Sequence, residues 1–185
     1  MRLALLLGVS LTLASGAMAL SLDGVAIPEE RIVEGTPLRL NGAGVRTASV
    51  FDIHVYVAGL FLEEPNRDAE AILNSHRPRL LELHFVHDLA AARVRQAWVE
   101  AFARTCPEPC RLPEPVVRQF LDAVPDMHKG DVAKFVFTAN TLRVAVNGRE
   151  MGVIHDPEFE RTVLATFLGS APASPRLKQD LLGVK

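Results

Sequence analysis

Residues 132–154 have the sequence VAKFVFT-AN-TLRVAV-NG-REMGVI, which is typical of consecutive antiparallel strands. Val, Phe and Thr favour a pleated, half-buried backbone. The pair Asn147-Gly148 is a strong hairpin signal, because both residues tolerate the positive φ that a tight two-residue turn requires. Ala139-Asn140 marks the other turn. We therefore predict a meander with strands over residues 132–138, 141–146 and 149–154.

The segments on either side of this meander predict further strands and several helices. Apolar residues recur at helical spacing in AAARVRQAWVEAFART, and we expect an amphipathic helix over 90–105, capped by Asp88. Apolar and polar residues alternate in the RLLELHFV stretch, which predicts a strand over 79–86 with one buried and one exposed face. Further helices are expected over residues 68–75, 116–124, 157–168 and 175–182.

The N-terminal third of the chain is predicted to be β-rich. Short strands are expected over 22–27 and 30–34, and a long β-rich run over 50–62. Leu38-Arg39-Leu40 leads into a turn at Asn41–Gly44, because Asn and Gly are typical turn residues. Strands followed by helices, a meander and more helices indicate an α+β fold.

Composition excludes several classes of protein. A chain of 185 residues fits one domain, and its net charge of −2 argues against a general nucleic-acid binder. Two Cys are too few for a four-Cys zinc module, and the six His do not cluster, so no metal site is expected. Gly42-x-Gly44 lacks the third glycine of a dinucleotide fingerprint, so no cofactor is expected either.

The N-terminus has the pattern of a secretory signal peptide. Arg2 precedes an apolar run, which ends in the small residues around Ala17 and Ala19. A membrane anchor requires about 20 apolar residues, and this run is shorter. We expect cleavage after Ala19, a single mature domain over 20–185 without a membrane span, and a periplasmic or secreted protein.

Export favours a disulfide between Cys106 and Cys110. The two cysteines enclose Pro107 and Pro109, which keep the segment out of a helix. A redox pair would prefer the C-x-x-C spacing at the start of a helix. In an oxidising compartment, a local disulfide that holds a loop is therefore the expected structure.

Arg46 and Tyr56 are the candidate ligand-binding residues. Arg46 lies in an otherwise apolar stretch, where a charge requires compensation for lost hydration, and Tyr56 is the only tyrosine. A guanidinium fork and a phenol together can hold a carboxylate or an enolate oxygen. The alternative is that Arg46 pairs with Asp52 or a neighbouring acid and that Tyr56 is an ordinary strand aromatic.

Several segments resemble the chalcone isomerase-like family, and its bacterial exported members in particular. These segments are LNGAGVR (40–46), HVYVAGLFL (54–62), CPEPC (106–110) and VLATFLG…SPRLKQDLLG (163–183). The resemblance implies an open-faced β-sandwich, in which helices pack on one face of a large antiparallel sheet. It also implies a ligand cleft between the sheet and the helices.

The resemblance to catalytic chalcone isomerases is incomplete. Arg46 matches their strand arginine, but Tyr56 occupies the position of their strand threonine. Their catalytic Tyr is expected near Ala90–Ala92 and their Asn near Ala97–Val99, and this chain has neither. Their late hydroxyl pair corresponds to Glu160-Arg161. Each lost donor typically costs 10²–10³-fold in rate, so the pattern argues against the isomerase reaction.

The fatty-acid-binding branch of the family is the better match. Its members hold the carboxylate with an Arg and with a Tyr in a VYA-x-G context, which correspond to Arg46 and Tyr56, and only Val57 departs from this motif. The resemblance therefore implies that the chain binds a fatty acid or similar anionic amphiphile without catalysis. An isomerase acting on a chalcone-like enone and a ligand-free structural module are the alternatives.

Overall fold

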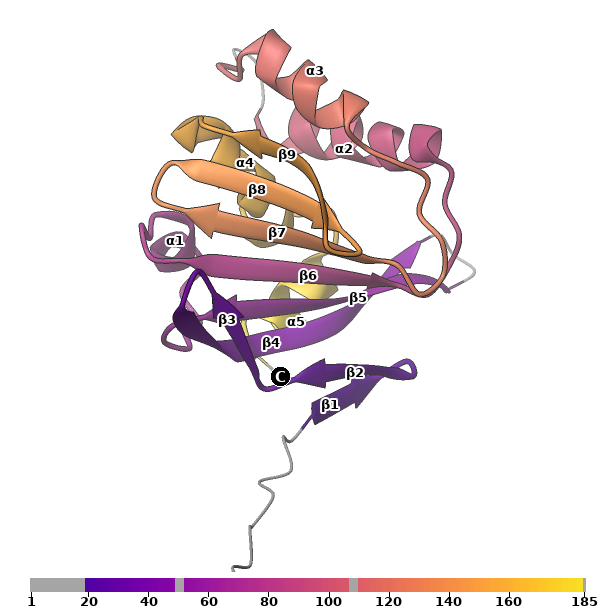
Figure 1. The fold of residues 1–185 in the computed structure, drawn as a ribbon, viewed down its shortest axis with the longest axis vertical. Helices are drawn as coiled ribbons and strands as arrows, with labels where there is room; N and C mark the ends of the chain where they lie inside the picture. Colours follow the sequence, from indigo (N-terminus) through magenta and orange to yellow (C-terminus); the bar gives the residue numbers. More distant parts are fainter. Residues whose placement is uncertain (1–18, 49–51, 107–109, 185) are drawn as a thin grey trace, which may run out of the picture.

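The computed structural model describes residues 19–48, 52–106 and 110–184, and it centres on a seven-stranded antiparallel sheet. The strands follow one another in chain order, so that each pairs with its neighbours in sequence (Figure 1). They are β3 (Glu30–Val33), β4 (Thr36–Ala48), β5 (Ile53–Leu62), β6 (Arg79–Phe85), β7 (Val132–Thr138), β8 (Thr141–Val146) and β9 (Arg149–Ile154). The predicted meander is confirmed with the bounds that the sequence indicated.

Five helices are described, and four of them, α2 to α5, pack on one face of the sheet. Figure 1 shows α4 and α5 behind the strands, and α2 with α3 beside β9. The helices are α1 (Ala69–Leu73), α2 (Ala91–Thr105), α3 (Glu114–Asp122), α4 (Pro157–Leu168) and α5 (Pro175–Leu181). A large apolar core joins them to the sheet. The predicted α+β fold, with helices packed on one face of a large antiparallel sheet, is confirmed.

A separate two-stranded hairpin covers part of the opposite face. It consists of β1 (Ala19–Leu22) and β2 (Val25–Pro28), and Ile27 of β2 is fully buried in a second, smaller apolar cluster. Residues 1–18, which hold most of the predicted signal peptide, lie outside the described residues. In the described part of the chain, no helix is long and apolar enough to cross a membrane.

The predicted turn at Asn41–Gly44 is wrong, because β4 continues through it with a bulge between Leu40 and Gly42. The two glycines instead allow α5 to approach the strand. A Cβ atom on Gly42 would lie 2.1 Å from the Asp180 carbonyl oxygen, and one on Gly44 would lie 2.5 Å from Asp180 Cβ. The Asn41 side chain donates a hydrogen bond to the Leu181 carbonyl at 2.8 Å.

The prediction that β6 has one exposed face is also wrong, since its charged residues are buried. Glu82 is fully buried on the face opposite the helices. Its carboxylate accepts hydrogen bonds from Arg31 at 2.8 and 2.9 Å, and it lies 2.9 Å from Lys134 Nζ. Burial raises the pKa of Glu82, but hydrogen bonds from His84, Arg31 and Lys134 outweigh it and hold this pKa well below its usual range.

The predicted cap of α2 by Asp88 is wrong as well. Asp88 accepts a hydrogen bond from the Lys129 amide at 2.7 Å, and Asp126 accepts one from the Ala91 amide at 2.7 Å. Asp126 thus satisfies a free N–H group at the start of α2 from a distant part of the chain.

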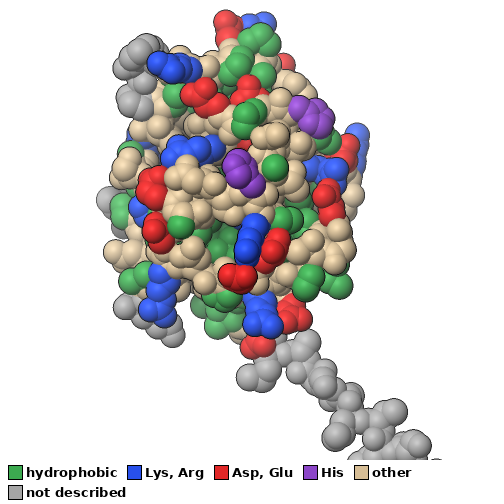
Figure 2. Space-filling model, turned by 90° about the vertical axis from the view of Figure 1, so that its left-hand side faces the viewer, with side chains coloured by type: hydrophobic (Ala, Val, Ile, Leu, Met, Phe, Trp, Pro, Cys, Tyr) green, Lys and Arg blue, Asp and Glu red, His purple; other side chains and the backbone are tan. Residues whose placement is uncertain are grey.

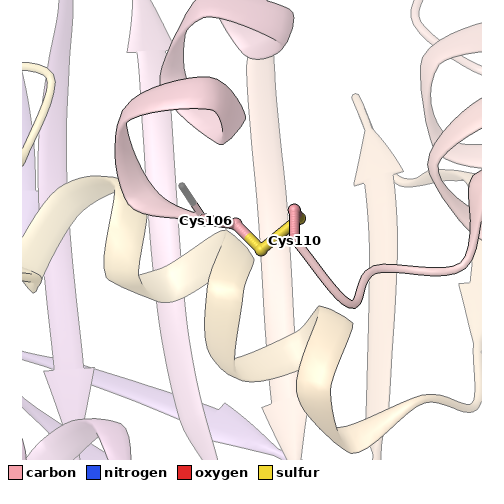
Figure 3. The surroundings of a disulfide bond; sticks show 2 residues. All are labelled: Cys106 and Cys110. Atoms are coloured by element: carbon pink, nitrogen blue, oxygen red, sulfur yellow. A yellow bond between two sulfur atoms is a disulfide. The ribbon is translucent and has the colours of Figure 1, made fainter. Parts of the chain in front are cut away.

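The expected disulfide is present between Cys106 and Cys110 (Figure 3). Cys106 ends α2, and Cys110 lies in the connection that leads to α3. Their Cα atoms are 5.2 Å apart, within the usual range for a disulfide. Because this bond closes the connection between α2 and α3, it limits how far the two helices can separate.

Candidate functional site

A cavity of about 280 Å³ lies between the sheet and the helices α2, α3 and α4. Its floor includes residues of every strand from β4 to β9, and its walls are mostly apolar. The residues that line it are Arg46, Ala48, Val55, Tyr56, Leu83, Phe85, Leu89, Arg93, Val94, Ala97, Trp98, Glu100, Ala101, Arg104, Gln119, Phe120, Ala123, Val124, Pro125, Met127, Ala133, Phe135, Val144, Val146, Met151, Gly152, Ile154, Thr166, Phe167 and Ala173.

Arg46 and Tyr56 lie side by side in the wall of this cavity. They are direct partners in the pairing of β4 with β5, which brings their side chains to the same face of the sheet. Nη1 of the Arg46 guanidinium donates a hydrogen bond to the Thr47 carbonyl. The Tyr56 ring packs against the ring of Phe85, its pairing partner on β6, and the two ring centroids are 5.6 Å apart.

The alternative pairing of Arg46 with Asp52 is wrong. Asp52 is exposed, and its carboxylate lies 4.0 Å from His54 Nε2. Within the described residues, Arg46 forms no ion pair. Arg46 itself lines the cavity.

The Tyr56 phenol stays protonated at neutral pH. Burial raises the pKa of Tyr56 to about 12, although the charge and hydrogen bond of Arg46 lower it. A protonated phenol donates a hydrogen bond, whereas a phenolate would repel an anionic ligand. Arg46 and Tyr56 together therefore offer an anion one positive charge and two kinds of donor.

We expect a spectroscopic titration to detect this shift directly, because Tyr56 is the only tyrosine. The near-ultraviolet absorbance of tyrosinate should appear with a midpoint near pH 12 in the folded protein. In denaturant the midpoint should fall to about 10, the ordinary value. Since the folded pKa is the higher one, this group lowers stability as the pH rises from about 10 to about 12. A folded-state midpoint near 10 would contradict the burial of the phenol.

Helix α2 contributes charged residues to the edge of the cavity. Arg93, Glu100 and Arg104 are all exposed, and both arginines are free of ion pairs to any described residue. Together with Arg46, the cavity is lined by three arginines against one glutamate. The face of the molecule in Figure 2 instead shows acidic and basic side chains interspersed. The described residues that line the cavity thus carry more positive than negative charge.

Trp98 forms the centre of an aromatic cluster within the core. The distance between ring centroids is 4.9 Å to Phe120, 5.7 Å to Phe102 and to Phe135, and 6.0 Å to Phe167. Trp98 belongs to the apolar core and is 9% exposed. It also lines the cavity, so its fluorescence can report on a ligand.

The positions expected for further isomerase residues do not form a second polar group in the cavity. Glu160 is buried and pairs with Arg79 at 2.6 Å, and Arg161 pairs with Glu70 at 3.2 Å. None of these four residues lines the cavity. Among the residues that the structure describes, no group of His, Cys, Asp or Glu side chains is placed to hold a metal ion.

Arg93, Arg104 and Gly152 line the cavity but were not predicted as site residues from the sequence. Positions 93, 97, 101 and 104 lie three or four residues apart, which places them on one face of α2, and this spacing could have indicated it. Gly152 gave no such signal, because an isolated glycine in a strand does not predict a cavity.

Comparisons with known proteins agree with this architecture. A family model described as chalcone isomerase-like matches residues 19–183. Among solved structures, the crystal structure of a fatty-acid binding protein of Arabidopsis thaliana matches with a TM-score of 0.73 and 16% sequence identity. The match covers 90% of this chain and 95% of that chain. No curated protein matches the chain.

Proposed function

Since the chain belongs to the chalcone isomerase-like family, we propose that it binds a fatty acid or a similar anionic amphiphile without catalysing a reaction. One observation carries this proposal: Arg46 and Tyr56 are paired in the wall of an otherwise mostly apolar cavity. The structural likeness to a fatty-acid binding protein supports it.

The headgroup of the ligand binds between Arg46 and Tyr56. A carboxylate accepts hydrogen bonds from the guanidinium and from the phenol, and it neutralises an arginine that lacks an acidic partner in the described residues. Such charge-assisted hydrogen bonds are roughly twice as strong as those between neutral groups. They also gain strength where the surrounding dielectric constant is low.

The acyl chain occupies the apolar remainder of the cavity. Leu83, Ala133 and Val146 form one cross-strand row of its floor, and Trp98 and Phe120 contribute to the helix side. Removing each methylene group of a ligand from water contributes about 0.8 kcal/mol. The acyl chain of the ligand therefore provides most of the affinity, and its headgroup fixes the orientation in the cavity.

We also propose that residues 1–19 are a signal peptide and that the mature domain, residues 20–185, is periplasmic or secreted. The short apolar run before Ala19 supports this proposal. The disulfide between Cys106 and Cys110 supports it too, because disulfides persist in oxidising compartments.

Native mass spectrometry of the purified protein tests both proposals. We expect a polypeptide mass that corresponds to residues 20–185, and a bound species whose mass matches a fatty acid. After delipidation, added palmitate should bind with one-to-one stoichiometry and change the fluorescence of Trp98. A delipidated protein that binds no fatty acid would contradict the proposed function.

The isomerase alternative has a separate readout. With a chalcone as substrate, we expect its absorbance to decay at the same rate with and without the protein. Among the polar groups of the cavity, only Arg46 matches a residue that the resemblance assigns to the isomerases. A faster decay that is lost on replacing Arg46 would favour the enzyme.

A further inference from the structure

Gly152 on β9 lies beside a bulge in the pairing of β8 with β9, and it is the one described glycine that has neither a positive φ nor another atom within 4 Å of its Cβ position. The other nine either have a positive φ or would bring a Cβ atom to within 3.2 Å of another residue. The first group is Gly24, Gly35, Gly130, Gly148 and Gly183, and the second is Gly42, Gly44, Gly59 and Gly169. At Gly152 nothing lies within 4 Å of the Cβ position, and φ is not positive.

A glycine inside a strand is unfavourable, since it loses more backbone freedom on folding than other residues and has no side chain to pack. Gly152 therefore leaves an open space that a methyl or a larger apolar group could fill. This space belongs to the cavity, because Gly152 lines it. Val144, its direct partner on β8, and Ile154, two residues along β9, line the same cavity. A side chain at position 152 would thus project between the sheet and the helices.

Gly152 lies on a strand of the cavity floor that is far from the strands of Arg46 and Tyr56. Tyr56 is on β5 and Gly152 is on β9, four strand positions apart in the sheet. At about 4.8 Å per strand, this corresponds to about 19 Å across the sheet. Gly152 also lies in the cross-strand row of Leu60, four residues from Tyr56 along β5, which adds about 13 Å in the strand direction and gives a separation of about 23 Å in a flat sheet. An extended acyl chain of a long-chain fatty acid spans a distance of this order.

We propose that Gly152 determines the chain length of the ligand, by leaving room for the last methylene groups of a long-chain fatty acid whose carboxylate lies at Arg46 and Tyr56. This inference rests on the proposed function and makes it more specific. It assigns the ligand to the long-chain class, and it assigns the selection of chain length to a single backbone position.

The test is a series of side chains of increasing volume, Gly152→Ala, Gly152→Leu and Gly152→Phe. Each delipidated variant is titrated with decanoate, laurate, palmitate and stearate, with Trp98 fluorescence as the readout. We expect the affinity for palmitate and stearate to fall stepwise along the series. Each methylene group displaced into water should weaken binding about fourfold. The affinity for decanoate should change less than about twofold, because its shorter chain ends before position 152.

Stability separates this role from a structural one. Filling empty space in a strand should leave the melting temperature of Gly152→Ala at or above that of the wild type. The affinity of Gly152→Ala for long-chain fatty acids should thus fall although this variant is at least as stable as the wild type. Val153→Phe is the matched control, since it adds the same ring to β9 at a position that does not line the cavity. Its profile of affinity against chain length should equal that of the wild type.

The outcomes distinguish the two proposals. If the wild-type protein binds no fatty acid of any length, both are wrong. If it binds long chains, but the three variants retain the same order and strength of binding, only the role of Gly152 is wrong. An equal loss of affinity for decanoate and stearate would also overturn it, because it would show general damage to the cavity. If Gly152→Phe does not fold, the comparison of Gly152→Ala and Gly152→Leu still decides.

Discussion

Arg46→Met is expected to weaken the binding of palmitate about 100-fold. The variant keeps an apolar side chain of similar length but removes the positive charge and all five N–H donors of the guanidinium. A bound carboxylate would then keep only the Tyr56 hydroxyl of the pair. Losing one partner of a buried, hydrogen-bonded charge pair typically costs 2–5 kcal/mol, which corresponds to about 30-fold or more in affinity. Titration of the delipidated variant, followed by Trp98 fluorescence, measures the effect.

Two further variants serve as controls for Arg46→Met. Arg46→Lys retains the charge but not the planar fork, and it should restore part of the affinity. Arg93→Met removes an exposed arginine from the edge of the same cavity. It should change the affinity at most about threefold, and mainly through the association rate at low salt. An Arg46→Met protein that binds palmitate as well as Arg93→Met would exclude Arg46 as the headgroup partner.

Glu160→Ala is expected to destabilise the fold by about 3–5 kcal/mol, because it leaves the Arg79 guanidinium buried without its charge partner. Arg79 is 1% exposed and Glu160 is 4% exposed, and their charged atoms are 2.6 Å apart. Arg79 also donates to the Ile72 carbonyl, while its Nε has no hydrogen-bond partner among the described residues. A buried arginine cannot relieve the loss by deprotonation, since its pKa is too high. Chemical denaturation at neutral pH measures this loss.

Arg79→Met should be less damaging, and its effect should depend on pH. Burial raises the pKa of Glu160, and Arg79 lowers it, so the pKa rises further when Arg79 is removed. Glu160 can then become neutral by binding a proton. Because its folded pKa lies above the unfolded value of 4.5, stability is highest at low pH and falls as the pH rises through the folded pKa.

The comparison is best made above pH 5, where Glu82, whose folded pKa is low, does not contribute to the pH dependence. The double variant with Arg79→Met and Glu160→Leu should recover most of the stability, because it leaves no unpaired charge. Equal losses for Glu160→Ala and Arg79→Met at every pH would contradict the argument from burial.

Local patterns predicted most elements of the fold but not their tertiary surroundings. The meander over 132–154 was predicted with correct bounds, because its Asn147-Gly148 turn and β-branched runs act over a few residues. The predicted turn at Asn41–Gly44 failed because these glycines accommodate α5, which lies far away in the sequence. The face of β6 was predicted to be exposed because Glu82 is charged, but Arg31 and Lys134 reach it from β3 and β7.

For the site, the sequence and its resemblance identified Arg46 and Tyr56, and the structure adds the cavity around them. The two residues become neighbours through the register of β4 with β5, including a bulge after Arg46 that local patterns do not reveal. Gly152 was not recognised for the same reason, since its importance arises only from the empty space around it. Their roles in binding a ligand remain predictions.

The contact between α5 and β4 has a consequence for the order of folding. The Asn41 side chain and the Leu181 carbonyl are 140 positions apart, yet they meet across this contact. Contacts of such long range form late, since a large loop must close first, whereas the hairpins of the meander need only nearby residues. The strand that carries Arg46 therefore reaches its final packing only after one of the last helices has been synthesised and has docked. We expect the ability to bind a ligand to appear late in refolding, after most of the sheet has formed.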